Sequence, residues 1–515
     1  MKKSVKKIKK TAAAPKAASA KKTVKKVAAA KPARKAAPAK KAAIVKKSAT
    51  KKAAAPKKAA PAKRPVAKTA ARKAAPVMPS AKALANKPGF TPATSASGPA
   101  PRQHVIIGNC IAAVSAAETL HKLNPNDRIV ILGDEAVPSY SRCLITYFLG
   151  GMVDKSHLLS HTAKWYADRN IDLQLSTRVV GVDATNRIVM AEQNGKAKKF
   201  SYDTLLVATG SSPIFLKSFP YDPNGIIGMR NYDDSRTLLG WAKPGKKAII
   251  IGAGFVGLKT AYGLVKRGVQ VKIVELLPTV LGRMTDLEAS GRVRDRLCAH
   301  ELLEIELNNS VIATRKQGDR YVVTYQDGTE EAADFIVASV GVKANTEFLQ
   351  GTGVEIDRIV NVDDYQRTTV DGIYAAGDVC RSRHIVSREW IYNAIWPVAA
   401  AQARVAAANM SSTDSRMIYE GNIPMNSVDF YELWITAIGD VQAEGPGIEE
   451  VTFKSQSIYQ KVKLQDGVPF AFMAVGNVDG AGILRGAIVA KTPWEEFIKK
   501  PHAQILPVVN QTRLG

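Results

Sequence analysis

The strongest chemical signature in the chain is a spaced set of glycines followed by one carboxylate. Gly252-x-Gly254-x-x-Gly257 ends an apolar β-branched run and opens a helical pattern, and a second apolar run ends at Glu275. Glycines at this spacing let a chain turn sharply and approach a pyrophosphate, and a terminal acid can accept hydrogen bonds from ribose hydroxyls. The stretch therefore predicts a strand, helix and strand unit that binds a dinucleotide.

The charges around this unit favour NADH over NADPH. The phosphates would lie at the positive end of the helix that begins near Phe255. The carboxylate of Glu275 would repel a 2′-phosphate, and Leu276 and Leu277 follow it where an arginine could have neutralised that phosphate. We therefore expect NADH at this unit.

A second stretch with the same layout opens the folded part of the chain, near residue 103. Gly108 follows an apolar run, but Cys110 and Ala113 replace the second and third glycines. Both replacements are small, and the next predicted strand leads to the acids Asp134 and Glu135. A second nucleotide site, with an acid near a ribose, is therefore expected here.

The remaining elements can be placed from their hydrophobic patterns. Residues 321–325 and 335–340 are typical of hairpin strands, and residues 396–410 form an Ala-rich helical pattern. From about residue 411 to residue 515 alternating strands predict a last α+β domain.

The net charge of +29 belongs to the first hundred residues. By count, residues 1–100 hold 29 Lys and Arg and no acid, whereas the rest of the chain holds 45 basic and 45 acidic residues. A Lys/Ala/Pro-rich segment without aromatics before Phe90 cannot bury enough apolar surface to order itself, so we expect a disordered tail. Two roles are open for this tail. It binds nucleic acid or another polyanion, or it only increases the solubility of the protein.

Cysteine and histidine spacing gives no metal site. The four cysteines form neither a disulfide framework nor a C-x-x-C pair. His157 and His161 are four apart on a predicted helix, but no H-E-x-x-H glutamate accompanies them, so a surface or capping pair is expected. The chain shows neither a secretory signal nor a membrane-spanning run, and we expect a cytoplasmic protein.

Five motifs in order give the chain, from about residue 103 to residue 410, a resemblance to the FAD-dependent pyridine nucleotide-disulfide oxidoreductases. They are the two glycine units, Ala208-Thr209-Gly210, Gly377-Asp378 and the late helix. The resemblance implies an α/β fold with two three-layer Rossmann-like domains and a C-terminal α+β interface domain. It implies FAD binding by residues 101–225 and 341–410, NADH binding by 226–340, and homodimer formation through 411–515.

The resemblance also assigns cofactor residues. For FAD these are Gly108, Cys110, Ala113, Glu135, Arg142, Thr209, Gly210, Gly377 and Asp378, the last contacting the flavin ribitol. For NADH they are Gly252, Gly254, Gly257, Glu275 and Gly341.

Within the family, Tyr140-Ser-Arg142-x-Leu and the Trp396-Pro helix are similar to rubredoxin and ferredoxin reductases and to nitrite reductase large subunits. This branch implies that electrons pass from NADH through FAD to a ferredoxin- or rubredoxin-like protein carrier. Lys259, where many relatives carry Glu, is a candidate catalytic residue near the nicotinamide or the flavin edge; otherwise it is a solvated or salt-bridged helix residue.

A second candidate activity depends on Cys143. The Cys-x4-Cys pair of dithiol reductases is absent, but Cys143 stands where coenzyme A-disulfide reductases and NADH peroxidases carry a single active cysteine. It could act in the reduction of a disulfide, persulfide or peroxide, or in an NADH oxidase, or it could simply fill space under the flavin. An oxygenase-coupled reductase is less favoured, because Tyr147 stands where that group usually has Lys.

A third interpretation, from a different functional class, is a redox sensor that the basic tail tethers to nucleic acid.

If the tail binds nucleic acid, deleting residues 1–100 should lower the affinity for double-stranded DNA at low salt, because the lysines no longer release counterions. Turnover with NADH should survive the deletion. Equal DNA affinity of the full and shortened chains in a salt titration would contradict the tethering.

Overall fold

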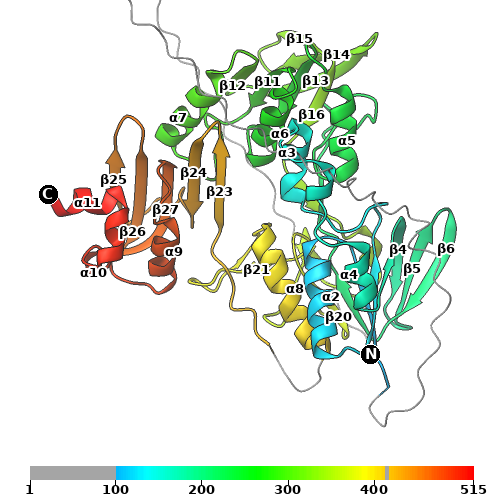
Figure 1. Cartoon of the computed structure of the whole chain (residues 1–515). Helices are drawn as coiled ribbons and strands as arrows, with labels where there is room; N and C mark the ends of the chain where they lie inside the picture. Colours follow the sequence, from blue (N-terminus) through cyan, green and yellow to red (C-terminus); the bar gives the residue numbers. More distant parts are fainter. Residues whose placement is uncertain (1–99, 412–416, 515) are drawn as a thin grey trace, which may run out of the picture. The chain divides into compact units, whose positions relative to one another are not determined.

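The computed structural model describes residues 100–411 and 417–514, so the predicted tail, apart from Ala100, lies outside the described residues. Two parallel sheets and one antiparallel sheet form the main layers (Figure 1). This confirms the predicted α/β class with two Rossmann-like units and a C-terminal α+β unit. Among the described residues, no helix is both long and apolar enough to cross a membrane.

The first parallel sheet has the strand order β20-β7-β1-β2-β3. Its strands are β1 (Gln103–Ile107), β2 (Arg128–Leu132), β3 (Ile171–Gln174), β7 (Thr204–Val207) and β20 (Ile373–Ala375). One face packs on α2 (Ile111–Leu123) and α8 (Trp396–Ser411), which lie side by side, and the other on β4 (Thr177–Asp183), β5 (Ile188–Gln193) and β6 (Lys196–Ser201) (Figure 1). Both faces are covered, which explains why the central strands β1, β2 and β7 are mostly apolar, whereas the edge strand β3 alternates apolar and polar residues.

The second parallel sheet has the order β12-β11-β10-β16-β9. Its first four strands repeat the arrangement β3-β2-β1-β7, but its outer strand β9 precedes β10 in the chain, whereas β20 is the last strand of the first sheet. Its strands are β9 (Ile226–Ile227), β10 (Lys247–Ile251), β11 (Gln270–Glu275), β12 (Leu303–Leu307) and β16 (Phe335–Ala338). It lies between helices α5 (Tyr232–Trp241), α6 (Phe255–Val265) and α7 (Leu287–Cys298) and the hairpins β13 (Val311–Gln317), β14 (Arg320–Tyr325) and β15 (Glu330–Ala333).

One expectation for this unit was wrong. The run 335–340 was expected in a hairpin, but β16 lies in the parallel sheet beside β10. A short apolar run after a hairpin does not reveal which strand it will pair with.

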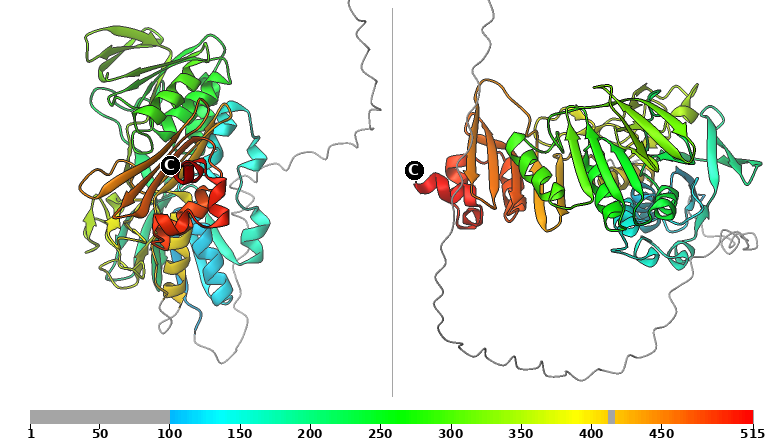
Figure 2. Two further views of the ribbon diagram at one scale, coloured as in Figure 1. Left: turned by 90° about the vertical axis from the view of Figure 1, so that its left-hand side faces the viewer. Right: turned by 90° about the horizontal axis from the view of Figure 1, so that it is seen from above.

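The C-terminal unit is an antiparallel sheet, β23-β24-β27-β26-β25, with helices on one face. The strands are β23 (Met425–Phe430), β24 (Leu433–Ile438), β25 (Ile448–Lys454), β26 (Tyr459–Gln465) and β27 (Val468–Gly476). Helices α9 (Ala481–Val489), α10 (Trp494–Phe497) and α11 (Pro507–Leu514) and the 3-10 helix η4 (Pro501–Ile505) pack on one face (Figure 2). Residues of the other face, such as Val428 and Ile435, join the core of the second unit.

Short elements connect these layers. They are η1 (Arg142–Leu144), α3 (Ile145–Gly150), η2 (Lys155–His157), α4 (Ala163–Asp168), β8 (Ser211–Pro213), β17 (Val342–Ala344), η3 (Glu347–Leu349), β18 (Ile356–Asp357), β19 (Ile359–Val360), β21 (Ser382–Arg383) and β22 (Trp390–Ile391).

The helix expected to carry His157 and His161 is not formed. Asp154 caps the short η2, and its carboxylate lies 2.8 Å from Nδ1 of His157. The ring of His161 stacks on Trp165, with the ring centres 4.0 Å apart. The two histidines therefore have separate structural partners, and the helical expectation was wrong.

Small residues set the distance between α2 and α8. Ala113 and Ala117 of α2 and Ala403 and Ala407 of α8 are all fully buried in one core. With only methyl groups at the contact, the helices lie too close for a larger side chain. The Ala-rich composition of both helices follows from this contact.

We expect Ala403→Leu to destabilise the protein by about 1–3 kcal/mol, because the fully buried site has no room for three more carbon atoms. Thermal unfolding followed by circular dichroism would measure the change. Arg404→Ala, at an exposed position of the same helix, is the matched control and should leave the midpoint almost unchanged. Equal midpoints for both variants would contradict close packing of α2 against α8.

Candidate active site

A cavity of about 1010 Å³ opens at the carboxyl ends of the first sheet. Its walls include the ends of β1, β2, β7 and β20, the start of α6 and part of β23. The cavity spans β1 and β7, which adjoin each other although β7 is far later in the chain. In open parallel sheets a ligand binds at such a switch in strand order.

The first glycine loop crosses the floor of this cavity. Gly108 has a φ of +112°, and a side chain on it would run into the carbonyl oxygen of Ala208. Cys110 stands at the N-terminus of α2 and lines the cavity, whereas Ala113 is fully buried between α2 and α8. Oδ1 of Asn109 is buried without a hydrogen-bond partner among the described residues, so the loop offers an unused acceptor.

The second glycine loop repeats this construction. Gly252 has a φ of +103°, and a side chain on it would meet the carbonyl oxygen of Ser339. A side chain on Gly257 would strike the carbonyl of Gly252 and push α6 away from β10. Gly341 follows Ser339 as Gly210 follows Ala208, so the two loops have matching neighbours. Gly254 caps α6 at its N-terminus.

Glu275 is held beside the second loop. Its Oε2 accepts a hydrogen bond from the backbone N–H of Ala253 at 2.7 Å, and its Oε1 accepts one from Leu277 at 2.9 Å. Each carboxylate oxygen can accept a further bond. The acid is therefore fixed where the sequence places a ribose, with acceptor capacity left.

The two predicted acids of the first unit, Asp134 and Glu135, both line the cavity but differ in their partners. Glu135 is paired with the guanidinium of Arg142 at 2.5 Å and accepts from Tyr140 Oη at 2.6 Å. Burial acts to lower the pKa of Arg142, but Tyr140 and Glu135 outweigh it and raise that pKa. Asp134 lines the same wall, is exposed, and has no hydrogen bond to the described residues. The geometry therefore favours Asp134 over Glu135 as the acceptor for a ribose.

Asp378 is positioned by an arginine that the sequence did not indicate. Nη2 of Arg230 lies 2.7 Å from Oδ2 of Asp378, and Nε of Arg230 donates to the carbonyl of Ser211 at 2.9 Å. All three residues and Gly377 line the cavity. Other residues of the wall that no motif indicated are Asn109, Arg178, Asn345, Met425, Asn426 and Ser427.

Thr209 lies in a turn that is tied to a distant residue. Its hydroxyl donates to the carbonyl of Asn345 at 2.8 Å, and the side-chain amide of Asn345 donates back to the carbonyl of Thr209 at 3.0 Å. Gly210, which follows, has a φ of +66°. The reciprocal pair fixes the turn at the cavity wall.

Cys143 opens into the cavity from η1. Partial burial raises the pKa of its thiol, and the nearby Cys110 and Asp378 raise it further. These surroundings act against the thiolate, which is the strongly nucleophilic form of cysteine. Among the described residues, no group of His, Cys, Asp and Glu is placed to hold a metal ion.

Lys259 lies behind the cavity wall rather than on it. The residue is only 5% exposed, and its Nζ contacts Tyr147 Oη at 2.7 Å and the carbonyl oxygen of Asp429 at 2.9 Å. The residues of α6 that do line the cavity are Phe255 and Val256. The structure thus brings the predicted FAD residues, except the buried Ala113, to one cavity that also reaches the start of the predicted NADH helix.

These features fit two dinucleotides. Two helix N-termini begin at tight glycine loops, an unused acceptor lies in the first loop, and acids stand beside both loops. The cavity at the first loop extends to the start of α6 at the second. A dinucleotide therefore fits each of the two loops.

We expect Glu275→Gln to lower kcat/KM for NADH about tenfold and to weaken the preference for NADH over NADPH, because a charged acceptor for the ribose is lost. Steady-state kinetics with both nucleotides would measure this. Glu301→Ala, at an exposed acid outside both loops, is the control. An unchanged ratio of the two kcat/KM values would count against Glu275 as the ribose ligand.

Known proteins share this organisation. A family model described as pyridine nucleotide-disulphide oxidoreductase matches residues 102–404. The chain is 30% identical to the NAD(P)H nitrite reductase of Bacillus subtilis, over 71% of the chain but 44% of that longer protein. It is 28% identical to a rubredoxin-NAD(+) reductase of Pseudomonas putida, over 60% of the chain and 80% of the relative.

A solved structure shows the same fold. The NAD-dependent persulfide reductase from A. fulgidus matches 80% of this chain and 84% of its own, with a TM-score of 0.70 and 22% identity. The family model, the two glycine loops and the shared cavity all indicate the same family. The chain belongs to the pyridine nucleotide-disulphide oxidoreductases and is an oxidoreductase that uses FAD and NAD(P)H.

Proposed function

We propose that the protein takes electrons from NADH and passes them through FAD to a ferredoxin- or rubredoxin-like protein carrier. One observation carries this proposal. The cavity at the first glycine loop reaches Phe255 and Val256, which begin the helix of the second loop. A nucleotide at each loop would therefore meet its neighbour inside one cavity.

We assign FAD to the first unit, residues 101–225 and 341–410, and NADH to residues 226–340. When bound, FAD accepts a hydride from NADH and can give up its electrons singly. Asp378, held by Arg230, offers a charged acceptor to a flavin hydroxyl, and Asp134 offers one to the adenosine ribose. Phe255 and Val256 exclude water where the two nucleotides meet.

The electrostatics of the cavity favour a protein carrier as the second substrate. Burial, Cys110 and Asp378 raise the pKa of the Cys143 thiol, which disfavours the thiolate that a disulfide or persulfide mechanism needs. A carrier that accepts electrons at the surface needs no such nucleophile. The similarity to a rubredoxin-NAD(+) reductase supports this choice, while the nitrite reductase relative is matched over 44% of its length only.

The second candidate is a Cys143-dependent reductase of coenzyme A disulfide, persulfide or peroxide, or an NADH oxidase. It is favoured by the position of Cys143, which opens directly into the cavity beside Asp378 and Cys110. The persulfide reductase from A. fulgidus has the same fold. Electron transfer to a carrier and thiol chemistry differ in whether Cys143 is needed.

Three further predictions concern partners and place. Binding of nucleic acid would be a property of the tail, residues 1–100, which apart from Ala100 lies outside the described residues. Both faces of the C-terminal sheet are covered within the chain, so a homodimer through this unit would use strand edges or helices. We also keep the cytoplasm as the predicted location.

An anaerobic titration with NADH, followed by flavin absorption, tests the function. Wild type and Cys143→Ser should both lose the flavin band at one equivalent of NADH per flavin, because flavin is then the redox centre that NADH reduces. Both should also reduce a ferredoxin or rubredoxin carrier at equal rates.

Two results would contradict the proposal. Absence of a flavin band after FAD is added would show that the first loop does not hold FAD. Uptake of a second equivalent by the wild type alone, with a long-wavelength band between thiolate and flavin, would establish Cys143 as a redox partner.

A further inference from the structure

Three segments from distant parts of the sequence meet at one end of the cavity. Cys143 comes from η1, Phe255 begins α6, and residues 425–427 belong to β23. These segments belong to the first, second and C-terminal units, respectively. Their relative positions determine how the site at the second loop faces the site at the first.

One ammonium group connects the residues directly behind these three walls. Nζ of Lys259 lies 2.7 Å from the hydroxyl of Tyr147, 2.9 Å from the carbonyl oxygen of Asp429 and 3.5 Å from the carboxylate of Asp429. We call Lys259, Tyr147 and Asp429 the lysine junction.

Each member of the lysine junction is a short step from the cavity wall. Lys259 follows Phe255 by four residues, which is about 6 Å along a helix. Tyr147 likewise follows Cys143 by four residues through η1 and α3. Asp429 follows Ser427 by two residues, which is about 7 Å along a strand. A shift of the junction would therefore move all three walls.

The ammonium group of the lysine junction is buried and therefore needs partners that stay in place. The side chain of Lys259 is 6% exposed, and the rings of Phe430 and Tyr262 lie 5.1 and 5.6 Å from its Nζ. A buried charge is tolerated only when its partners stay in place, and removing one partner is costly. Burial lowers the pKa of Lys259, while Asp429 acts in the opposite direction. The three segments are therefore held at fixed distances.

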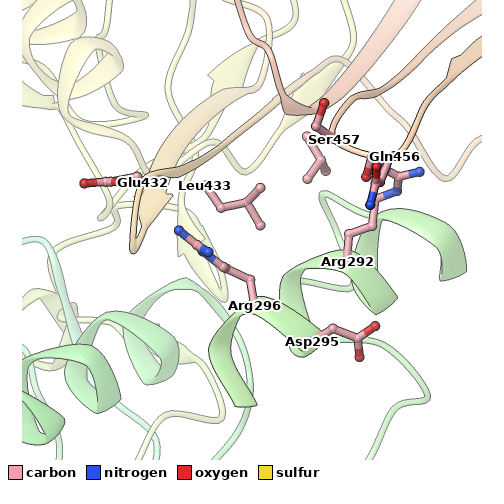
Figure 3. Close-up of a pocket in the computed structure, with 8 residues that line it drawn as sticks. Arg292, Asp295, Arg296, Glu432, Leu433, Gln456 and Ser457 are labelled. Carbon is pink, nitrogen blue, oxygen red and sulfur yellow. The ribbon is translucent and has the colours of Figure 1, made fainter. Parts of the chain in front are cut away.

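Close contacts on either side reinforce the lysine junction. A side chain on Gly263, one turn after Lys259, would lie 2.8 Å from the carbonyl oxygen of Thr146, so α6 and α3 meet at their backbones. The carbonyl of Tyr431, at the tip of the β23–β24 hairpin, accepts from Nε of Arg296 at 2.9 Å. Figure 3 shows Arg296 projecting from α7 toward this hairpin, beside Leu433 and Glu432.

The tip of the β23–β24 hairpin has an energetically unfavourable backbone conformation. Tyr431 and Glu432 have φ values of +48° and +67°, a conformation that normally selects glycine or asparagine. The ring of Tyr431 packs edge-on against Tyr262, with the ring centres 4.6 Å apart. The unfavourable turn persists because its contacts with the second unit over-determine it.

From these contacts we infer that Lys259 is a positioning residue, and that the lysine junction fixes the distance between the NADH and FAD sites by tying α6 to α3 and to β23. This inference rests on the proposed function. It also assigns to the C-terminal unit a part in aligning the two cofactors, through Asp429. Lys259 acts through the walls and need not touch either nucleotide.

The test compares Lys259→Met, which keeps the length of the side chain but removes the charge, with the wild type. Lys259→Met should keep its flavin and bind NADH within about threefold of the wild-type Kd. The rate of flavin reduction in anaerobic stopped flow should fall about tenfold or more, because a small misplacement of reacting groups slows the reaction steeply. The long-wavelength absorption of the nicotinamide stacked on the flavin should weaken as well.

Lys454→Met is the matched control. Lys454 pairs with Glu288 at 2.6 Å and so also joins β25 to α7, but neither residue lines the cavity. It should leave the rate and the absorption band unchanged. If Lys259→Met fails to fold, Tyr147→Phe carries the test. It removes the hydroxyl that accepts from Lys259 Nζ at 2.7 Å and donates to Asp429 Oδ1 at 3.3 Å, and it should slow reduction about threefold.

The outcomes separate the inference from the proposed function. A wild type whose bound flavin NADH does not reduce would overturn both. A reactive wild type together with a folded Lys259→Met of equal rate and equal absorption band would overturn the inference alone. Equal loss of rate in Lys259→Met and Lys454→Met would also overturn it, because any contact between the two units would then suffice.

Discussion

Both nucleotide loops depend on one steric constraint, the close approach of a glycine to the last carbonyl of a neighbouring strand. Gly108 lies against Ala208, and Gly252 lies against Ser339, each with a positive φ. Only glycine allows this contact, which turns the chain out of the sheet and points the next helix at the ligand. The cavity, the orientation of α2 and α6, and the position of the acids all follow from it.

The repeated topology explains why the two sites can share one cavity. Each unit has the same order of four parallel strands and a three-stranded antiparallel insertion before the strand that the glycine loop contacts. Two such units could face each other in many ways, since nothing in either loop specifies the other. The contacts of α3 with α6, and of the C-terminal hairpin with α6 and α7, select one arrangement.

The sequence predicted the parts of the site that are local. The glycine loops, Glu275 and Asp378 stand within short strand, turn and helix motifs whose geometry repeats among proteins. Arg230, Asn345 and residues 425–427 could not be predicted, because they reach the cavity through contacts with residues far away in the sequence. Glu135 and Arg142 are only seven residues apart, but they pair across an irregular loop whose geometry no motif specifies, so the sequence could not distinguish Glu135 from Asp134 as the free acid.

Ionisable groups on the cavity wall and those buried behind it have different roles. On the cavity wall, Asp378 and Asp134 offer acceptors to hydroxyl groups, while burial, Cys110 and Asp378 raise the pKa of the Cys143 thiol. Behind the wall, the ammonium of Lys259 is enclosed by Tyr147 and Asp429. A charge in water would gain little from such contacts, but a buried charge requires all of them. Lys259, which the sequence suggested as a catalytic residue, therefore holds three segments together, because its buried charge interacts with protein groups rather than with a ligand.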